Sequence, residues 1–130
     1  MEFLKIEATK STPEINFDFA AGLLEIKGLS KSTNALEFFQ PLMDALEIYA
    51  EKAQPVTNVN LFLEYFSTSS SKCLLGILNE LKKMHRRVTK VHVNWYYEEN
   101  DDDMLDTIKD YENLVDLDFK FIAVPEGGSI

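Results

Sequence analysis

Apolar and polar residues alternate along the chain at two periods, and these periods separate strands from helices. A period of two, typical of strands, occurs near residues 3–8, 15–19, 24–26, 59–66, 91–97 and 117–123. Recurrence at three and four residues, typical of amphipathic helices, occurs near residues 35–52, 74–84 and 104–111. A hairpin followed by strand–helix alternation predicts a single α/β domain over residues 1–130, with a mixed sheet of five to six strands, three main helices and a loose tail at about 125–130.

Several single residues refine the predicted boundaries. Gly22 follows two alanines and provides the backbone freedom that a hairpin turn needs, and residues 28–33 are interpreted as a loop. Asn34 followed by Glu37 resembles a capping box at the start of the first helix. Pro41 lies inside that helical pattern, so we expect a kink or a short separate first turn there.

The stretch from Val59 to Met84 joins a strand to a helix and organises the rest of the chain. Its first half has apolar residues at both sets of alternating positions, which predicts a strand that is covered on both faces of the sheet. Its second half places Gly76 within a helical stripe, where glycine is about 1 kcal/mol less favourable than alanine. We expect this glycine to permit a close approach of the helix to the sheet.

Five consecutive hydroxyl side chains, Ser67 to Ser71, lie between this strand and this helix, and Lys72 follows them. The first turn of a helix has unpaired backbone N–H groups and the positive end of the dipole, so a serine or threonine commonly caps it. The same position favours a phosphate, either on a bound ligand or attached to one of the hydroxyls. Helix physics alone favours the simple cap. Five hydroxyls exceed what a cap needs, and a lysine in the first turn is unfavourable without a nearby phosphate, so both interpretations stay open.

The composition and charge exclude several classes of function. Of 130 residues, 45% are hydrophobic, so the chain can bury a core. The formal net charge of −9 argues against nucleic acid and against anionic membranes as partners. We expect a cytoplasmic protein, because no apolar stretch reaches membrane-spanning length and the first residues lack the pattern of a signal peptide. The single cysteine, Cys73, precludes an internal disulfide and is interpreted as a small buried hydrophobe.

The sequence offers no convincing set of catalytic or metal-binding groups. His85 and His92 belong to different elements, and no Gly-x-Ser-x-Gly elbow accompanies the serines. The scattered glycines do not form a nucleotide-binding loop. The acidic run from Glu98 to Asp106 lacks the ligand spacing and central glycine of a calcium loop, and it suits the solvated start of a helix. We therefore expect a non-enzymatic protein without a metal or a cofactor.

Three stretches together resemble one known family. They are Tyr65 to Lys72 with the apolar helix that follows, Ser11 to Pro13, and Val93 to Tyr97. In this order and spacing they resemble the SiaC family of bacterial regulatory phosphoproteins, and the resemblance covers nearly the whole chain. The order of elements also resembles the STAS fold of anti-sigma factor antagonists, in which the phosphorylated residue lies between a strand and the next helix.

The resemblance to the SiaC family implies a partner-switching protein. In that family a Ser/Thr kinase phosphorylates the threonine that corresponds to Thr68, and a metal-dependent Ser/Thr phosphatase removes the phosphate. The unphosphorylated form binds and activates a diguanylate cyclase, which raises cyclic di-GMP and promotes biofilm formation. By this resemblance Thr68 is the phosphoacceptor, and its matching neighbours are Ser67, Ser69, Ser70 and Lys72.

The chain departs from the family pattern in two places. Ser67 stands where asparagine is usual and adds a competing hydroxyl, and Arg86–Arg87 occupies a turn that is often rich in glycine. Because the sequence does not encode its partners, two other functions stay open. One is an anti-sigma factor antagonist that also switches by phosphorylation, and the other is a domain that holds a phosphate ligand in the hydroxyl loop.

Aromatic residues at two strand ends are further candidates for contact with a partner. Tyr65 ends one predicted strand, and Trp95, Tyr96 and Tyr97 end the next. Tryptophan and tyrosine are enriched in interface hot spots. The same residue types also suit a strand end that is half inside the core, so both roles are open for these four residues.

Overall fold

Six strands and three helices make up residues 2–130, the part of the chain that the computed structural model describes. The strands are β1 (Phe3–Ile6), β2 (Glu14–Asp18), β3 (Leu23–Ser30), β4 (Val56–Phe66), β5 (Lys90–Glu98) and β6 (Asp118–Val124). The helices are α1 (Ala35–Ala50), α2 (Thr68–Met84) and α3 (Asp102–Leu114). None of these helices is both long and apolar enough to cross a lipid bilayer. The predicted α/β class, with a mixed sheet and three helices, is confirmed.

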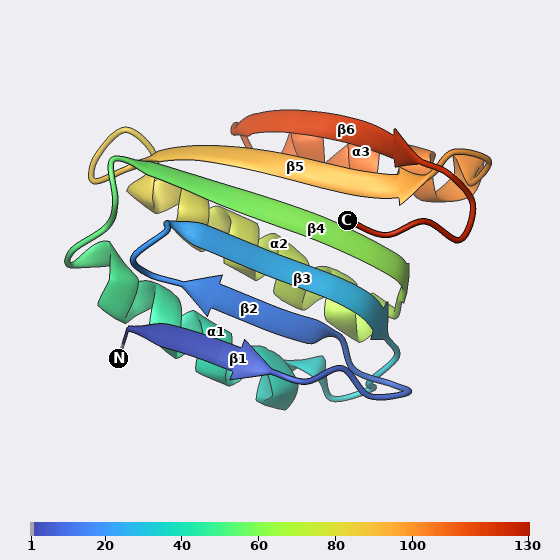
Figure 1. Cartoon of the computed structure of the whole chain (residues 1–130), viewed down its shortest axis with the longest axis horizontal. Coiled ribbons are helices and arrows are strands. Elements are labelled where there is room, and N and C mark those ends of the chain that lie inside the picture. Colours follow the sequence, from blue (N-terminus) through green and yellow to red (C-terminus); the bar gives the residue numbers. More distant parts are fainter. Residues whose placement is uncertain (1) are drawn as a thin grey trace.

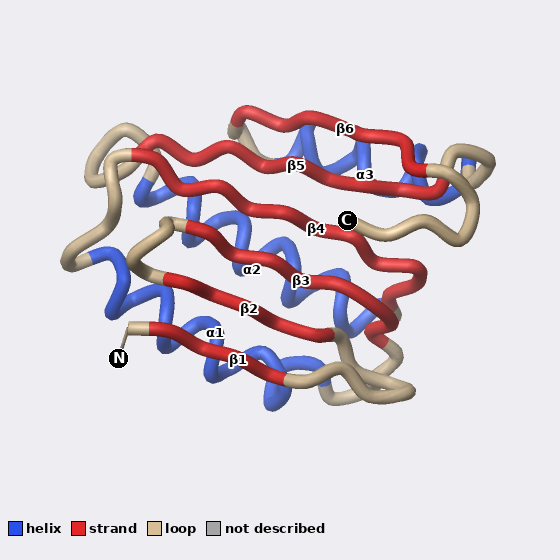
Figure 2. The backbone as a smooth tube through the Cα atoms, in the orientation of Figure 1, coloured by secondary structure: helices blue, strands red, loops and turns tan. Residues whose placement is uncertain are grey.

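The strands form one mixed sheet in the order β1-β2-β3-β4-β5-β6. The first three strands pair antiparallel, and β3 to β6 pair parallel. One helix connects each parallel pair, and each connection moves one strand further across the sheet. Because such crossovers share one handedness, all three helices lie on the same face, and Figure 1 shows them behind the sheet. The tube in Figure 2 shows the opposite face without a helix.

This one-sided cover corrects the expectation that β4 is covered on both faces. Its helix-facing side chains are buried, whereas Asn58 is exposed and Asn60 is half-buried on the other face. Asn60 donates to the Glu25 carboxylate of β3 at 3.1 Å and accepts from the Asn94 amide of β5 at 3.0 Å. A ladder of polar side chains therefore crosses the open face, and Phe62 is an apolar exception there with only 7% of its surface exposed.

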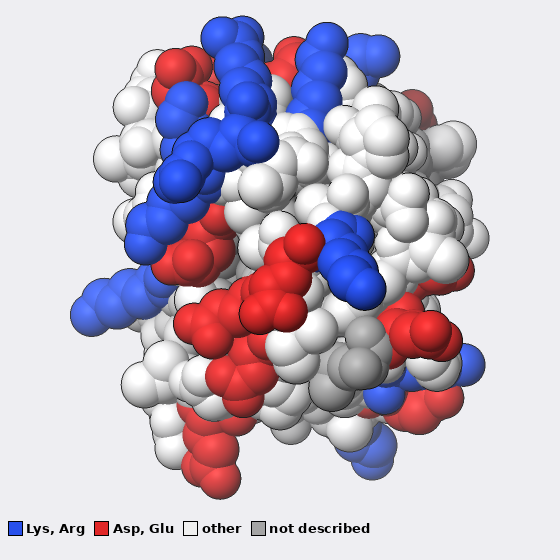
Figure 3. Space-filling model, turned by 90° about the vertical axis from the view of Figure 1, so that its left-hand side faces the viewer, with Lys and Arg blue, Asp and Glu red and all other residues white. Residues whose placement is uncertain are grey.

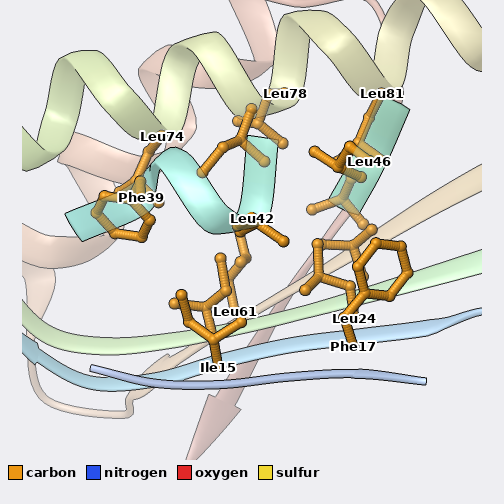
Figure 4. Packing of buried hydrophobic residues seen from close by; sticks show 14 of the residues in the cluster. Ile15, Phe17, Leu24, Phe39, Leu42, Leu46, Leu61, Leu74, Leu78 and Leu81 are labelled. Atoms are coloured by element: carbon orange, nitrogen blue, oxygen red, sulfur yellow. The ribbon is translucent and has the colours of Figure 1, made fainter. Parts of the chain in front are cut away.

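The hydrophobic core lies between the sheet and the helices α1 and α2 (Figure 4). Strand residues at every second position meet helix residues at every third and fourth position, as the two periods in the sequence predict. The labelled members of this core are each at most 1% exposed: Ile15, Phe17, Leu24, Phe39, Leu42, Leu46, Leu61, Leu74, Leu78 and Leu81. Because each such side chain contributes about 1.5–3 kcal/mol on burial, the core holds α1 and α2 firmly on the sheet.

Two predicted boundaries differ from the structure. Strand β3 continues to Ser30, so residues 28–30 belong to the strand rather than to a loop. Gly28 has a φ of 119° and lies where the pairing of β3 with β4 shifts register, which explains why the alternation stops there. Pro41 lies exposed inside the uninterrupted helix α1 and does not divide off a separate first turn.

The turn between α2 and β5 has a backbone shape that favours glycine. Arg86 has a φ of 67°, and it is the one non-glycine residue with positive φ among residues 2–130. Its N–H donates to the carbonyl of Thr89 at 2.7 Å. This turn is thus formed with an arginine at a left-handed position that glycine would adopt without strain.

We expect Arg86→Gly to raise the free energy of unfolding by about 0.5–1 kcal/mol, because a left-handed backbone strains any residue with a Cβ atom. Arg87→Gly is the matched control at an exposed neighbour whose φ is not positive. It should lower the free energy of unfolding, because it only adds freedom to the unfolded chain. Urea unfolding measures both changes, and an equal loss of stability in both variants would contradict strain at Arg86.

Candidate functional site

The hydroxyl cluster begins with Ser67, which caps helix α2. Its backbone is extended, and its Oγ accepts the N–H of Ser70 at 3.1 Å. A cap by a hydroxyl residue is therefore present at the predicted place. The same Oγ donates to the carbonyl of Ser32 at 2.9 Å. The Ser67 hydroxyl is therefore half-buried and engaged in structural hydrogen bonds.

Ser70 lies on the inner side of the first turn of α2. It is 0% exposed, and its Oγ lies 2.6 Å from the Oγ of Ser30, which is 1% exposed. The Ser70 hydroxyl also lies 3.1 Å from the Ser30 carbonyl, within hydrogen-bond reach. A phosphate on Ser70 would bury about two negative charges against neutral hydroxyl groups, which is strongly unfavourable. This serine therefore serves the fold.

Ser69 connects the start of α2 to the start of α1. Its Oγ accepts the backbone N–H of Ala35, the first residue of α1, at 3.1 Å. The predicted capping box was wrong, because the Asn34 side chain makes no cap hydrogen bond and instead donates to Glu37 at 2.9 Å. The acceptor for α1 comes from a residue far away in the sequence, which no local pattern indicates.

Ser71 connects α2 to α3. Its Oγ lies 2.8 Å from the hydroxyl of Tyr111, and burial raises the pKa of that tyrosine, with the hydrogen bond to Ser71 opposing the effect. The Tyr111 ring packs 4.9 Å from the ring of Trp95. Trp95 is 0% exposed, so it is a core residue with no surface available for a partner. Its indole Nε1 has no hydrogen-bond partner among the described residues.

Thr68 differs from its four neighbours. It is exposed, it is the first residue of α2, and its side chain makes no hydrogen bond within residues 2–130. Lys72, also exposed, follows one turn later. Because the N-terminus of a helix favours negative charge, a phosphate on Thr68 would face solvent and the positive end of the dipole together. Among the five candidate hydroxyls, Thr68 is the one that is both accessible and unengaged.

The predicted aromatic candidates are divided by a change of register. Regular alternation places Tyr65 on the buried side of β4 with Leu63, but the pairing of β4 with β3 skips Glu64. As a result, Phe66 points toward the core, and its ring centroid lies 6.5 Å from that of Trp95. Tyr65 is instead 50% exposed, at the end of β4 that precedes the hydroxyl cluster.

The two remaining aromatic candidates on β5 are half-buried. Tyr97 packs against the core, and Tyr96 lies at the alternate position, which faces the open side of the sheet. Tyr65 instead lies three residues before Thr68, at the end of β4 that leads into the hydroxyl cluster. Of the four aromatic candidates, Tyr65 is therefore the exposed one that is nearest to Thr68 in the chain.

An apolar hollow of about 310 Å³ opens between α1 and the first turns of α2. Its lining consists of Leu36, Phe39, Met43, Ser69, Lys72, Cys73 and Gly76. Leu36 continues the apolar stripe of α1, yet it is 66% exposed. Burial raises the pKa of the Cys73 thiol, so this side chain remains protonated and contributes apolar surface. The hollow was not predicted from the sequence. Its one signal in the sequence is that the apolar stripe of α1 includes more residues than the helix buries against the sheet.

Gly76 does not have the predicted role. A Cβ atom added at this position would find no atom of the sheet or of another element within 4 Å, so the glycine does not permit a close approach to the sheet. It lines the hollow instead. Glycine in the middle of a helix is about 1 kcal/mol less favourable than alanine for helix stability. Packing inside the protein therefore does not explain why residue 76 is a glycine.

The histidines lie at the other end of α2. His85 follows the last residue of the helix, and its Nδ1 accepts the N–H of Val91 at 2.9 Å. Burial lowers the pKa of His85, and the nearby charges of Arg86 and Lys82 lower it further, which keeps the ring neutral as an acceptor. With 17 residues at about 1.5 Å each, α2 separates this end from the hydroxyl cluster by about 25 Å.

Basic side chains gather at this same end of the molecule (Figure 3). Within residues 82–90 they are Lys82, Lys83, Arg86, Arg87 and Lys90. Lys82 pairs with Asp116 at 3.4 Å and Lys83 with Glu80 at 3.0 Å. The charge of this end complements the negative end of the α2 dipole, and it is remote from Thr68.

Comparison with known families identifies the chain. Residues 6–124 match the family described as SiaC family regulatory phosphoprotein. The chain belongs to the SiaC family. It is 31% identical over 121 residues to an uncharacterized protein of Pseudomonas aeruginosa strain UCBPP-PA14. The aligned residues cover 93% of this chain and 94% of that protein. The resemblance seen in the sequence is thus confirmed, and the chain is a member of a family of regulatory phosphoproteins.

Solved SiaC structures share the fold. Apo-SiaC from Pseudomonas aeruginosa aligns with a TM-score of 0.87 at 29% identity and covers 95% of this chain and 100% of that chain. A second structure contains the diguanylate cyclase SiaD from Pseudomonas aeruginosa in complex with its activator SiaC, and it aligns with a TM-score of 0.87 at 29% identity over 93% of this chain and 99% of that chain. The family thus includes an activator of a diguanylate cyclase.

Proposed function

We propose that this chain is a non-enzymatic phosphoswitch that binds and activates a diguanylate cyclase while Thr68 is unphosphorylated. The observation that carries the proposal is the division of the hydroxyl cluster. Thr68 is exposed and makes no internal hydrogen bond, whereas the four serines are engaged with Ser30, Ser32, Ala35 and Tyr111. The complex of the relative SiaC with the cyclase SiaD supports the choice of partner.

The switch works through local electrostatics. Phosphorylation adds about two negative charges at the positive end of the α2 dipole, which tolerates them without a change of fold. Thr68 directly precedes Ser69, which lines the apolar hollow, and it follows the exposed Tyr65 by three residues. A partner that covers this surface must strip water from the phosphate, which is unfavourable. Binding and phosphorylation of Thr68 therefore exclude each other.

Two enzymes set the state of the switch. A Ser/Thr kinase transfers phosphate to Thr68, and a metal-dependent Ser/Thr phosphatase hydrolyses it. The exposure of Thr68 supports this role, since each enzyme must reach the side chain. Because the kinase uses ATP and the cyclase uses GTP, we place this exchange in the cytoplasm, where the resulting cyclic di-GMP controls biofilm formation.

Phosphopeptide mass spectrometry on the chain isolated from its native host tests the site. We expect phosphate on Thr68, its complete loss in Thr68→Ala, and none on Ser70, because Ser70 is fully buried. Phosphate on Ser67 or Ser69 instead would contradict the assignment to Thr68. The absence of phosphate under every growth condition in which the kinase is expressed would contradict the switch itself.

A further inference from the structure

We propose that the hollow between α1 and α2 receives one apolar side chain from a helix of the partner, with a partner carboxylate beside Lys72. The inference rests on the proposed function and names the contact that phosphorylation of Thr68 would disrupt. It assigns a binding role to residues of the hollow that the phosphosite itself does not need, above all Gly76 and Leu36.

Gly76 is the first argument for an occupant. The position is helical, and a Cβ atom there would meet nothing within 4 Å in the chain outside its own helix, so the fold itself would accept alanine. The missing side chain instead leaves space in the wall of the hollow. Gly76 keeps this space open although glycine lowers the stability of the helix. The presence of glycine is explained if a side chain of another molecule fills the space.

The chemistry of the lining is the second argument. Met43 and the protonated Cys73 present apolar surface beside the buried ring of Phe39, and Leu36 is 66% exposed at the edge. Large apolar side chains held in contact with water next to a concave surface are typical of protein-binding sites. The occupant is therefore a leucine-sized apolar side chain rather than a polar ligand.

The setting of the hollow determines the rest of the occupant. It lies between two helices that pack side by side on the sheet (Figure 1), and such grooves commonly accept an amphipathic helix. Lys72 lines it, is exposed, and forms no ion pair within residues 2–130. On a chain with a net charge of −9, this unpaired cation selects a helix that carries a carboxylate about one turn from its apolar side chain.

Substitutions at Gly76 separate binding from stability. The chain is produced without its kinase, and its affinity for the purified diguanylate cyclase of its own host is measured by isothermal titration calorimetry together with cyclic di-GMP production. We expect Gly76→Leu, which fills the hollow, to weaken binding at least about tenfold, and Gly76→Ala to weaken it several-fold. Gly76→Ala should nevertheless raise the thermal unfolding midpoint by about 3–5 °C.

Two further variants complete the test. Asn113→Leu is the matched control, because it adds an exposed leucine to α3, outside the hollow, without changing the charge; it should bind as the wild type does. Lys72→Glu should weaken binding about tenfold, and added salt should reduce this difference. If the wild type binds the cyclase and Gly76→Leu binds equally well, the inference is overturned while the proposed function stands. If the wild type does not bind the cyclase, both are overturned.

Discussion

Replacement of Thr68 by glutamate should weaken binding of the diguanylate cyclase about a hundredfold, which corresponds to about 2.7 kcal/mol, and should leave the fold intact. The carboxylate brings a negative charge to the exposed first residue of α2, where the partner would have to bury it against the apolar hollow. Calorimetric titration of the purified cyclase with each variant measures the loss, and the rate of cyclic di-GMP production should fall with it.

Thr68→Gln is the control that separates charge from size. Glutamine has the shape of glutamate without its charge, so we expect Thr68→Gln to bind within a few-fold of the wild type. Both variants should unfold within about 1 kcal/mol of the wild type, because the side chain is exposed and makes no internal hydrogen bond. Equal losses of binding in both variants would show that the partner requires the threonine itself, and retention of binding by Thr68→Glu would argue against an electrostatic switch.

The elements of the fold were predictable because each one is encoded by a local pattern. The buried residues of α2, Leu74, Leu78 and Leu81, recur at three and four positions, and those of β5, Val91, Val93 and Trp95, at every second position. A helix or strand must bury one stripe or one face, so the period alone identifies it. The order of elements then limits the sheet to parallel crossovers after a hairpin.

The features that sequence reasoning missed depend on contacts between distant residues. The alternation of apolar residues along a strand shows which side chains can be buried, but it does not show which faces of the sheet carry helices. For this reason the sequence predicts, wrongly, that β4 is covered on both faces. The shift of register that exposes Tyr65 arises in the pairing of β4 with β3. The acceptor for the first N–H of α1 is Ser69, 34 residues away in the chain.

The position of the candidate site was visible in the sequence, but its internal order was not. Five hydroxyls between a strand and a helix mark the N-terminus of α2, because this is where the period changes from two to three and four. The choice of Thr68 depended on the family resemblance. In the structure, Thr68 is distinguished because each of the four serines forms a hydrogen bond with a residue 34 to 40 positions away in the chain. These partners are Ser30, Ser32, Ala35 and Tyr111.

Ser70→Asp should lower the free energy of unfolding by about 3–5 kcal/mol, the usual effect of an uncompensated buried charge. Ser70 is 0% exposed, and its nearest polar neighbours are the hydroxyls of Ser30 and Ser67, at 2.6 and 3.0 Å, and the carbonyl of Ser30, at 3.1 Å. None of these groups carries a charge that could balance a carboxylate. Urea unfolding at neutral pH measures the loss, which should diminish at lower pH, because desolvation raises the pKa of a buried carboxyl group above its unfolded value and protonation then favours the folded state.

Thr68→Asp is the matched control for this change, because it places the same carboxylate two residues earlier in the same helix. There the charge is exposed to water and faces the positive end of the dipole, so we expect the free energy of unfolding to stay within about 1 kcal/mol of the wild type. A switch must accept charge at its modified residue without unfolding, and stability retained by Thr68→Asp satisfies that condition. A large loss in Ser70→Asp alone would then show that burial distinguishes Thr68 from Ser70. If both carboxylates were equally tolerated, burial would not distinguish the hydroxyls, and the structural argument for Thr68 as the modified residue would fail.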